Sequence, residues 1–273
     1  MAKLHMLNSV RDTINTSFVL QDGEELVVVD GGFPCEAPYL HEYLLGLGGK
    51  VKAWFLTHNH GDHVGAMISI LRDYDDITVE KVYYHFPSNA FFEENEPKQS
   101  TMPSAEQADL IRNTLKKEQI PAVTVEAGDI YTFGNISVRV LLTPDETMPS
   151  GINDTSCVYL MEVSDQKILF LGDLGVKGGN RLLAQVDPDL LRVDYVQMAH
   201  HGQGGVDRPV YEAIRPRFCL WCTPTWLWDN IDRNLGRYDS GQYKTVIVRG
   251  WMSEMGCVKR HYRMWEGTQV IKL

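Results

Sequence analysis

The chain has 273 residues, 44% of them hydrophobic, which is enough to bury a sizeable core. Its 26 basic and 36 acidic residues give a formal net charge of -10. This balance argues against a protein that binds polyanions regardless of sequence, because such proteins need clustered lysines and arginines. It leaves a phosphate ester open as a substrate, because bound divalent cations would reverse the local charge.

Targeting and cysteine features point to the cytoplasm. The first eight residues contain neither the apolar core nor the cleavage site of a secretory signal peptide. No apolar run approaches the roughly 20 residues that cross a bilayer. The five cysteines are odd in number and scattered, and Cys219 and Cys222 form a C-x-x-C pair inside a predicted strand, so we interpret them as structural. These features predict a cytoplasmic protein without membrane contact.

The first half of the chain predicts a hairpin followed by alternating helices and strands. Asp22-Gly23 is a turn signal between two strand-like segments. In chain order, hydrophobic spacing predicts strands at 17–21 and 25–30, a helix at 36–48, a strand at 51–57, a helix at 64–72 and a strand at 79–85. Residues 86–103 are polar and contain three prolines, which predicts a surface loop or lid. A helix at 104–117 follows, with Ser104 as its N-cap and Gln107 as the capping-box partner.

The second half of the chain is richer in predicted strands. These lie at 122–126, 130–133, 136–142, 157–163, 167–171, 192–198, 218–221, 245–249, 257–261 and 268–273. Short helices are expected at 182–186 and 210–214. The chain has no internal sequence repeat and no linker, so we expect one α/β domain spanning residues 1–273. Residues 206–273 are expected to complete its second half and to form a pocket wall.

Four potential metal ligands lie within six residues, on a loop between a predicted strand and a helix. They are His58, His60, Asp62 and His63. Three histidines and an aspartate among glycines are hard to explain by packing, whereas nitrogen and carboxylate ligands suit zinc, manganese or iron. Ends of strands are also where open α/β sheets place functional groups. This cluster therefore predicts a metal site.

Potential ligands also follow two further predicted strands. Asp173 closes an apolar strand as an isolated acid, and a site with two metals needs a carboxylate between ions roughly 3.5–4 Å apart. His200 and His201 end another strand and supply another imidazole. The remaining histidines have no ligand-like neighbours in sequence and are expected to be structural: His5, His41, His85 and His261.

An aromatic segment near the C-terminus is the best candidate for a substrate pocket. Trp226, Trp228 and Asp229 follow Trp221 closely. An aromatic wall with a carboxylate could hold a quaternary ammonium group or stack on a base. Packing of these tryptophans over the edge of the sheets is the alternative interpretation.

At this point the sequence resembles a known family. The run from Thr57 to Gly65 resembles the H-x-H-x-D-H signature of the metallo-β-lactamase superfamily. Asp30-Gly31-Gly32 upstream and Leu171-Gly172-Asp173 downstream match the flanking features of that family in the same order. The resemblance implies an α/β (α+β) fold, a four-layer αββα sandwich, with two metal ions at its edge.

Two segments indicate which branches of the superfamily the sequence resembles most. Ala199-His200-His201-Gly202 resembles the H-H-G ending of the DNA-uptake (competence-protein) and phosphorylcholine-esterase branches. The stretch from Asn153 to Ser156 resembles the N-x-x-S stretch of these branches, where many other members carry a third histidine for the first ion. The first metal would then have fewer protein ligands, completed by Asp154 or water.

The resemblance also implies a role for each motif residue. His58 and His60 would hold the first metal, Asp62, His63 and one of the His200/His201 pair the second, with Asp173 bridging. The order within the pair stays open; we favour His201 as the ligand and His200 as a catalytic neighbour that contacts a phosphate or donates a proton.

The expected function is hydrolysis of a phosphodiester or related small ester by a hydroxide that bridges two divalent ions. Zinc is expected first, with manganese or iron as alternatives. Asp62 would orient the nucleophile, and a protonated His200 would assist the leaving group. A lactone, thioester or β-lactam hydrolase and a non-catalytic metal-binding sensor remain alternatives. An oxygen-reducing di-iron enzyme is disfavoured, because Asn59 and Gly61 rather than acids separate the ligands. We expect a small-molecule substrate, or nucleic acid only as a short or single-stranded one.

Overall fold

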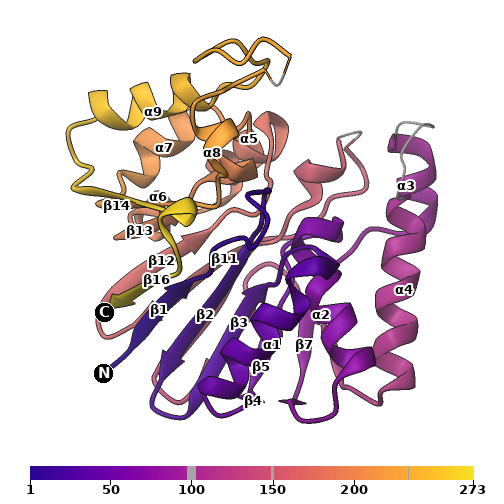
Figure 1. The fold of residues 1–273 in the computed structure, drawn as a ribbon. Helices are drawn as coiled ribbons and strands as arrows, with labels where there is room; N and C mark the ends of the chain where they lie inside the picture. The colour runs from indigo at the N-terminus through magenta and orange to yellow at the C-terminus, as the bar shows by residue number, and fades with distance from the viewer. Residues whose placement is uncertain (97–102, 149–150, 233) are drawn as a thin grey trace.

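Two large β-sheets lie at the centre of the protein (Figure 1). The computed structural model describes residues 1–96, 103–148, 151–232 and 234–273. The first sheet has the order β16-β1-β2-β3-β5-β7-β8, with strands β1 Lys3–Met6, β2 Ser17–Asp22, β3 Glu25–Asp30, β5 Ala53–Phe55, β7 Val82–Tyr84, β8 Ala122–Thr124 and β16 Gln269–Lys272. The second has the order β15-β14-β13-β12-β11-β10-β9, with strands β9 Ile130–Phe133, β10 Ile136–Leu142, β11 Val158–Val163, β12 Gln166–Phe170, β13 Tyr195–Gln197, β14 Phe218–Trp221 and β15 Arg260–Arg263. A separate short pair joins β4 Lys50–Val51 to β6 Thr78–Val79.

The two sheets share one pairing pattern. In each, three antiparallel pairs are followed by three parallel pairs, counted from β16 in the first sheet and from β9 in the second. Parallel strands end at the same edge, so the loops after β3, β5, β12, β13 and β14 can meet there. The termini lie side by side because β16 pairs with β1 (Figure 1).

Helices cover the outer faces of both sheets (Figure 1). Those of the first half are α1 Ala37–Gly46, α2 Gly61–Asp73, α3 Asn89–Asn95 and α4 Ser104–Lys117. Those of the second half are α5 Val176–Gln185, α6 Pro188–Leu191, α7 Arg208–Ile214, α8 Thr225–Trp228 and α9 Thr245–Glu254. Single 3₁₀ turns lie at η1 Pro34–Glu36, η2 Ile152–Thr155, η3 Ala199–Gly202 and η4 Met264–Glu266.

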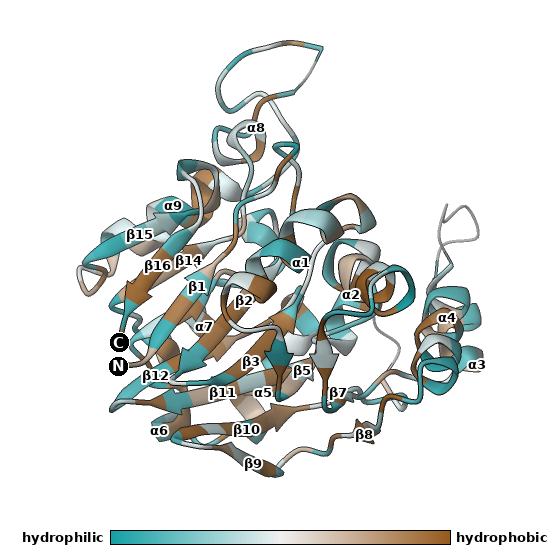
Figure 2. Cartoon of the chain, turned by 60° about the horizontal axis from the view of Figure 1, so that its bottom comes forward, coloured by the Kyte–Doolittle hydropathy of each residue, from teal (hydrophilic) through white to brown (hydrophobic). Residues whose placement is uncertain are grey.

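Apolar alternation along the strands builds three stacked cores. On β2, Phe18 and Leu20 face the core between the sheets, whereas Val19 faces the helices of the first half. The rings of Phe18 and Phe170 meet edge to face at 5.1 Å across the inter-sheet core. Burying each such side chain stabilises the fold by about 1.5–3 kcal/mol. Figure 2 shows the apolar residues along the strands of both sheets. The αββα order expected from the resemblance is confirmed.

Two segments differ from the sequence prediction. Residues 245–249 contain four β-branched residues in a row and predict a strand. They instead begin helix α9, whose buried Thr245, Val248 and Met252 recur at helical spacing. The predicted loop 86–103 contains helix α3, begun by the Ser88 side chain, which accepts a hydrogen bond from the Phe91 amide. Residues 97–102 of that loop lie outside the described residues.

The start of α4 and the N-terminal strand also differ. Pro103, rather than Ser104, is the N-cap of α4 and makes no side-chain cap, so the capping-box prediction is wrong. The backbone amide and hydroxyl of Ser104 instead donate to the two oxygens of Glu96 at 2.8 Å each. Strand β1 was not predicted, because four residues carry too little periodicity.

Across the described residues, none of the helices combines the length and apolar composition that crossing a membrane requires. The C-x-x-C cysteines face opposite ways, with Cys219 in the outer core and Cys222 in the inter-sheet core. Both are free thiols, which agrees with a structural role.

Candidate metal centre

The loop that joins β5 to α2 brings four polar side chains to the edge of the first sheet. His60 is the N-cap residue of α2, and Asp62 and His63 occupy its first turn, where the helix dipole favours a carboxylate. His58, Asp62 and His63 are buried, and His60 is partly buried. The short loop between the end of β5 and the start of α2 thus turns four polar side chains within six residues towards one place.

Asp173 approaches the same place from the second sheet. It follows β12 through Gly172, whose φ of 56° favours glycine. A Cβ on Gly172 would lie 2.8 Å from Cβ of Thr57, so this glycine allows the two loops to touch. The Asp173 amide donates to Oγ of Ser156 at 3.1 Å. Close approach of the two sheets therefore depends on a residue without a side chain.

His200 and His201 lie in a strained turn after β13. Their φ values are 50° and 53°, both in the left-handed region that residues other than glycine rarely adopt. The turn is held by the His200 amide, which donates to the Gly172 carbonyl at 3.0 Å, and by the Thr223 hydroxyl, which donates to the His201 carbonyl at 2.6 Å. Such strain costs of order 1–3 kcal/mol per residue and is concentrated at functional sites.

These segments form two groups of potential ligand atoms that share Asp173. One group contains Asp62, His63, Asp173 and His201, and the other contains His58, His60 and Asp173. Within each group the atoms lie within 4.8 Å of one another. The structure thus brings together the six residues that the sequence analysis proposed as ligands, in the same two sets.

The buried ligand atoms lie close together as ion pairs, but several of them have no aligned hydrogen bond. Nε2 of His201 lies 2.9 Å from Oδ2 of Asp62, and Nε2 of His63 lies 3.1 Å from Oδ1 of Asp173. Yet Nε2 of His58, His63 and His201 and Oδ1 of Asp173 are buried without an aligned hydrogen-bond partner. Unpaired buried polar atoms are costly, and atoms that aim at a common point are satisfied by a cation there. These residues therefore fit divalent metal ions with nitrogen and oxygen ligands.

The electrostatics of the two groups differ. Burial alone would lower the pKa of His63 and His201, but the carboxylates of Asp173 and Asp62 outweigh it. They raise the pKa of His201 to about 9 and that of His63 well above its ordinary value. Burial lowers the pKa of His58 and of His60, so these imidazoles are neutral at pH 7.

Outer partners orient the histidines of the four-residue group. Nδ1 of His63 lies 2.7 Å from Oδ2 of Asp30, and Nδ1 of His201 lies 3.1 Å from the Cys222 carbonyl oxygen. Such bonds fix the tautomer and leave Nε2 for the metal. This role of Asp30 was not predicted from the sequence. The signal was Asp30 at the end of a buried strand, before two glycines.

His200 lies beside the centre and is partly exposed, outside both groups. Its Nε2 is 3.7 Å from Oδ2 of Asp173 and 3.1 Å from Nδ2 of Asn153, and its side chain is 26% exposed. Burial lowers its pKa, so a neutral imidazole replaces the protonated one expected from the sequence. Asp154 does not join the first group, because its Oδ1 accepts a hydrogen bond from the Gly178 amide at 2.8 Å in the first turn of α5.

The three residues predicted to bind the substrate, Trp226, Trp228 and Asp229, lie in different surroundings. Trp228 is buried, meets Trp221 edge to face at 5.1 Å and lies 4.0 Å from the Arg249 guanidinium. Asp229 is 3.8 Å from the same arginine, which offsets its charge. Trp226, by contrast, lines a cavity of about 330 Å³ together with Asp232 and Tyr243. Of the three predicted residues, Trp226 alone lines this cavity.

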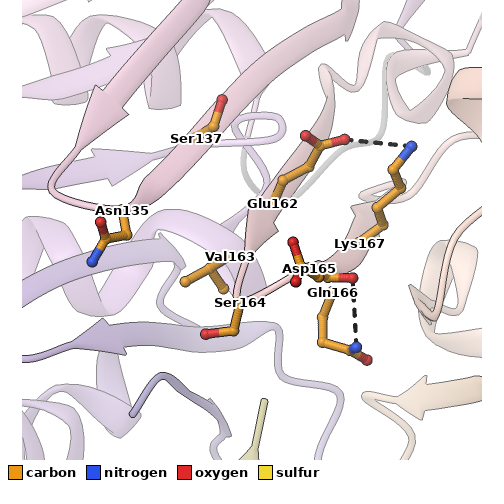
Figure 3. A pocket seen from close by; sticks show the side chains of 8 residues that line it. All are labelled: Asn135, Ser137, Glu162, Val163, Ser164, Asp165, Gln166 and Lys167. Atoms are coloured by element: carbon orange, nitrogen blue, oxygen red, sulfur yellow. Dashed lines mark hydrogen bonds and ion pairs between the residues drawn. The ribbon is translucent and has the colours of Figure 1, made fainter.

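Another cavity lies away from the centre. It has a volume of about 420 Å³ and surrounds the β11–β12 turn, with Glu162, Asp165 and Lys167 on its walls (Figure 3). That turn is at the opposite end of both strands from Asp173. The remaining histidines are also engaged elsewhere, in contacts of His5 with Tyr43, His41 with Asp76, His85 with the Val125 carbonyl and His261 with Trp221.

Several other proteins are similar to parts of this sequence. A hydroxyacylglutathione hydrolase of Francisella philomiragia is 28% identical over 184 residues, which are 66% of this chain and 55% of that protein. The ComE operon protein 3 of Bacillus subtilis is 24% identical over 172 residues, 63% of this chain and 20% of that protein. The chain spans about half the length of the hydroxyacylglutathione hydrolases that it matches.

Solved structures share the fold at low identity. The metallo-beta-lactamase fold protein YhfI of Bacillus subtilis has a TM-score of 0.53 at 12% identity and covers 96% of both chains. CmlA, a diiron beta-hydroxylase of Streptomyces venezuelae, has a TM-score of 0.59 at 13% identity and covers all of this chain and 54% of its own. Residues 10–229, most of the chain, match the family model of the metallo-beta-lactamase superfamily. The chain belongs to the metallo-beta-lactamase superfamily.

Proposed function

We propose that this protein is a metal-dependent hydrolase with two metal sites that share Asp173. The observation that carries the proposal is the pair of ligand groups around buried atoms without hydrogen-bond partners. His58, His60 and Asp173 would hold the first ion, and Asp62, His63, Asp173 and His201 the second. Zinc suits these ligands best, and manganese or iron also fits them.

Two divalent ions at this position would supply Lewis acidity and a water of lowered pKa. The protein's own residues arrange the reaction around them. Asp62, whose Oδ2 lies 2.9 Å from Nε2 of His201 in the second group, would orient the attacking water as well as serve as a ligand. His200, outside both groups, would contact the substrate, and its protonated fraction, small at pH 7 because burial lowers its pKa, would assist the leaving group. Asn153 holds the His200 ring in place.

A phosphodiester or related small ester is the first substrate class. The Asn153 amide and the partly exposed His200 lie beside the ligand groups, where a substrate's anionic oxygens would lie next to the ions. Trp226 and its cavity are proposed to receive the remainder of a small molecule. Nucleic acid enters the proposal only as a short or single-stranded substrate, since the formal charge is -10.

A thioester is the second candidate. It is favoured by the similarity to a hydroxyacylglutathione hydrolase, a name that denotes thioester hydrolysis. Both candidates use the same ligand groups and differ in the leaving group. An alkoxide or phenoxide benefits from a donor such as His200, whereas a thiolate leaves with little assistance because thiols are the stronger acids.

The test compares the two bonds on one preparation. Protein purified without chelator is assayed for metal content, then for turnover of bis-p-nitrophenyl phosphate and of a hydroxyacyl thioester. We expect close to two equivalents of metal and faster turnover of the phosphodiester, both lost after chelation and restored by zinc. Faster thioester turnover would favour the second candidate. Bound metal without turnover of any ester would indicate a non-catalytic metal-binding protein.

A further inference from the structure

The two ligand groups are held by different means. In the four-residue group, His63 and His201 each bond through Nδ1 to a fixed acceptor, the Asp30 carboxylate and the Cys222 carbonyl. In the other group, Nδ1 of His58 lies 3.3 Å from the Thr57 hydroxyl, at the long end of the hydrogen-bond range. Within the described residues, no hydrogen bond reaches the His60 ring. The orientation of His60 therefore depends on its backbone.

Asn59 fixes that backbone from between the two histidines. It is fully buried, and its Nδ2 donates to the Ser104 carbonyl at 2.6 Å, across 45 residues of sequence. This side chain belongs to neither ligand group, and its position between His58 and His60 leaves both flanking peptides tied to helix α4. A short, buried amide-to-carbonyl bond of this kind is a specific restraint on the loop.

Helix α4 is a firm anchor for the restraint. Its Ala108, Ile111 and Leu115 are buried in the outer core of the first half. Its first residue, Ser104, is held by both carboxylate oxygens of Glu96, which follows helix α3. The restraint therefore runs from Glu96 through Ser104 to Asn59 and ends between the two histidines of the first group.

We infer that Asn59 is a positioning residue that sets the metal affinity of the first site, through its bond to Ser104. This inference rests on the proposed metal sites and adds that they are unequal. The second site is pre-organised by Asp30 and Cys222. In the first, the His60 carbonyl accepts hydrogen bonds from the His63 and Val64 amides, and the Asn59 bond to Ser104 is the restraint that reaches α4. Loss of outer partners typically weakens metal binding about 10–100-fold. Loss of the Asn59 amide should produce such a change at the first site alone.

The experiment titrates the metal-free protein with Zn²⁺ against a chromogenic chelator. The constants are assigned to sites with His60→Ala, which removes a donor of the first group only. Asn59→Ala is expected to raise the first-site dissociation constant about 10–100-fold and to leave the second unchanged. Ser104→Ala removes the hydroxyl bond to Glu96 but keeps the carbonyl acceptor, and should produce a smaller rise in the same constant.

Asn95→Ala is the matched control. Nδ2 of Asn95 also donates to a backbone carbonyl, that of Phe91 at 2.9 Å, but this bond lies within α3 and does not reach the metal loop. It should change neither constant. Thermal unfolding of the metal-free variants shows whether a shift reflects general destabilisation, and Ser104→Ala serves if Asn59→Ala does not fold.

The outcomes separate the inference from the proposed function. If the unaltered protein binds two Zn²⁺ ions but Asn59→Ala weakens both sites equally, or neither, Asn59 does not position the first site. If the unaltered protein binds no Zn²⁺, the metal sites themselves are wrong and the inference falls with them. A selective loss at the first site supports both.

Discussion

Nδ1 of His63 lies 2.7 Å from Oδ2 of Asp30, and both side chains are fully buried. The same carboxylate accepts hydrogen bonds from the Thr57 amide and hydroxyl at 2.8 and 2.7 Å. Asp30 therefore joins the end of β3 to both the metal loop and a ligand. It orients His63 without belonging to either ligand group.

Replacing this carboxylate should weaken metal binding at the second site. Asp30→Asn keeps the shape but removes the charge that raises the basicity of His63. We expect the second-site affinity to fall about 10–100-fold, measured by Zn²⁺ titration. Asp30→Ala should also lower the free energy of unfolding, because each buried donor left unpaired costs about 1–3 kcal/mol. Asp165→Asn, on the exposed β11–β12 turn, is the control, and wild-type affinity in Asp30→Asn would contradict the assignment.

Asp173 is the one residue shared by both ligand groups. Asp173→Ala should therefore reduce metal content at both sites, whereas His60→Ala should remove the first ion and leave the second. Elemental analysis of protein purified without chelator measures this directly. Equal losses in the two variants would show that Asp173 does not bridge two sites.

Metal binding should release protons at neutral pH. In the metal-free protein the raised pKa of His201, about 9, and that of His63 keep both imidazoles protonated at pH 7. A cation must displace these protons, so zinc affinity should rise from pH 6 towards pH 9. Calorimetry in buffers of different ionisation enthalpy counts the protons. Release of none at pH 7 would contradict protonation of the metal-free site.

The same shifts give the stability of the metal-free protein a defined pH dependence. Because the pKa of His201 is raised above its unfolded value of 6.5, its ion pairs stabilise the fold fully below pH 6.5. That contribution should disappear as the pH rises through about 9. Urea unfolding of metal-free protein between pH 6 and pH 10 tests this, with the zinc-loaded protein as the comparison.

His200 should affect turnover more than metal binding. Because it lies outside both ligand groups, His200→Gln should retain both ions but lower kcat, and general acid assistance is typically worth about 10²–10⁴-fold. The loss should be greatest for substrates with poor leaving groups. Asn153→Ala should cause a smaller loss of the same kind. If His200→Gln instead lowers metal content, His200 is a ligand and its assignment as the catalytic neighbour is wrong.

Much of the fold could be predicted because its signals are local. Strand β3 is an uninterrupted apolar run that ends at Asp30, and helix α2 repeats its apolar residues at helical spacing. Helix α9 was mistaken for a strand because Val246, Ile247 and Val248 favour strands locally, whereas its packing against the outer core selects a helix. Strand β1 exists only because β2 and β16 pair with it on both sides.

The sequence by itself determined the identity and spacing of the ligands, because His58, His60, Asp62 and His63 lie within six residues and their chemistry is local. Only the tertiary structure decided how Asp173 and His201 join them, that Asp30 orients His63, and that Asn59 ties the loop to Ser104. These contacts link residues 33 to 139 positions apart in the chain, and those of Asp173 and His201 depend on the approach of two sheets. No local pattern encodes such an approach. It depends on the packing of the two sheets and on positions such as Gly172, where a side chain would hold the loops apart.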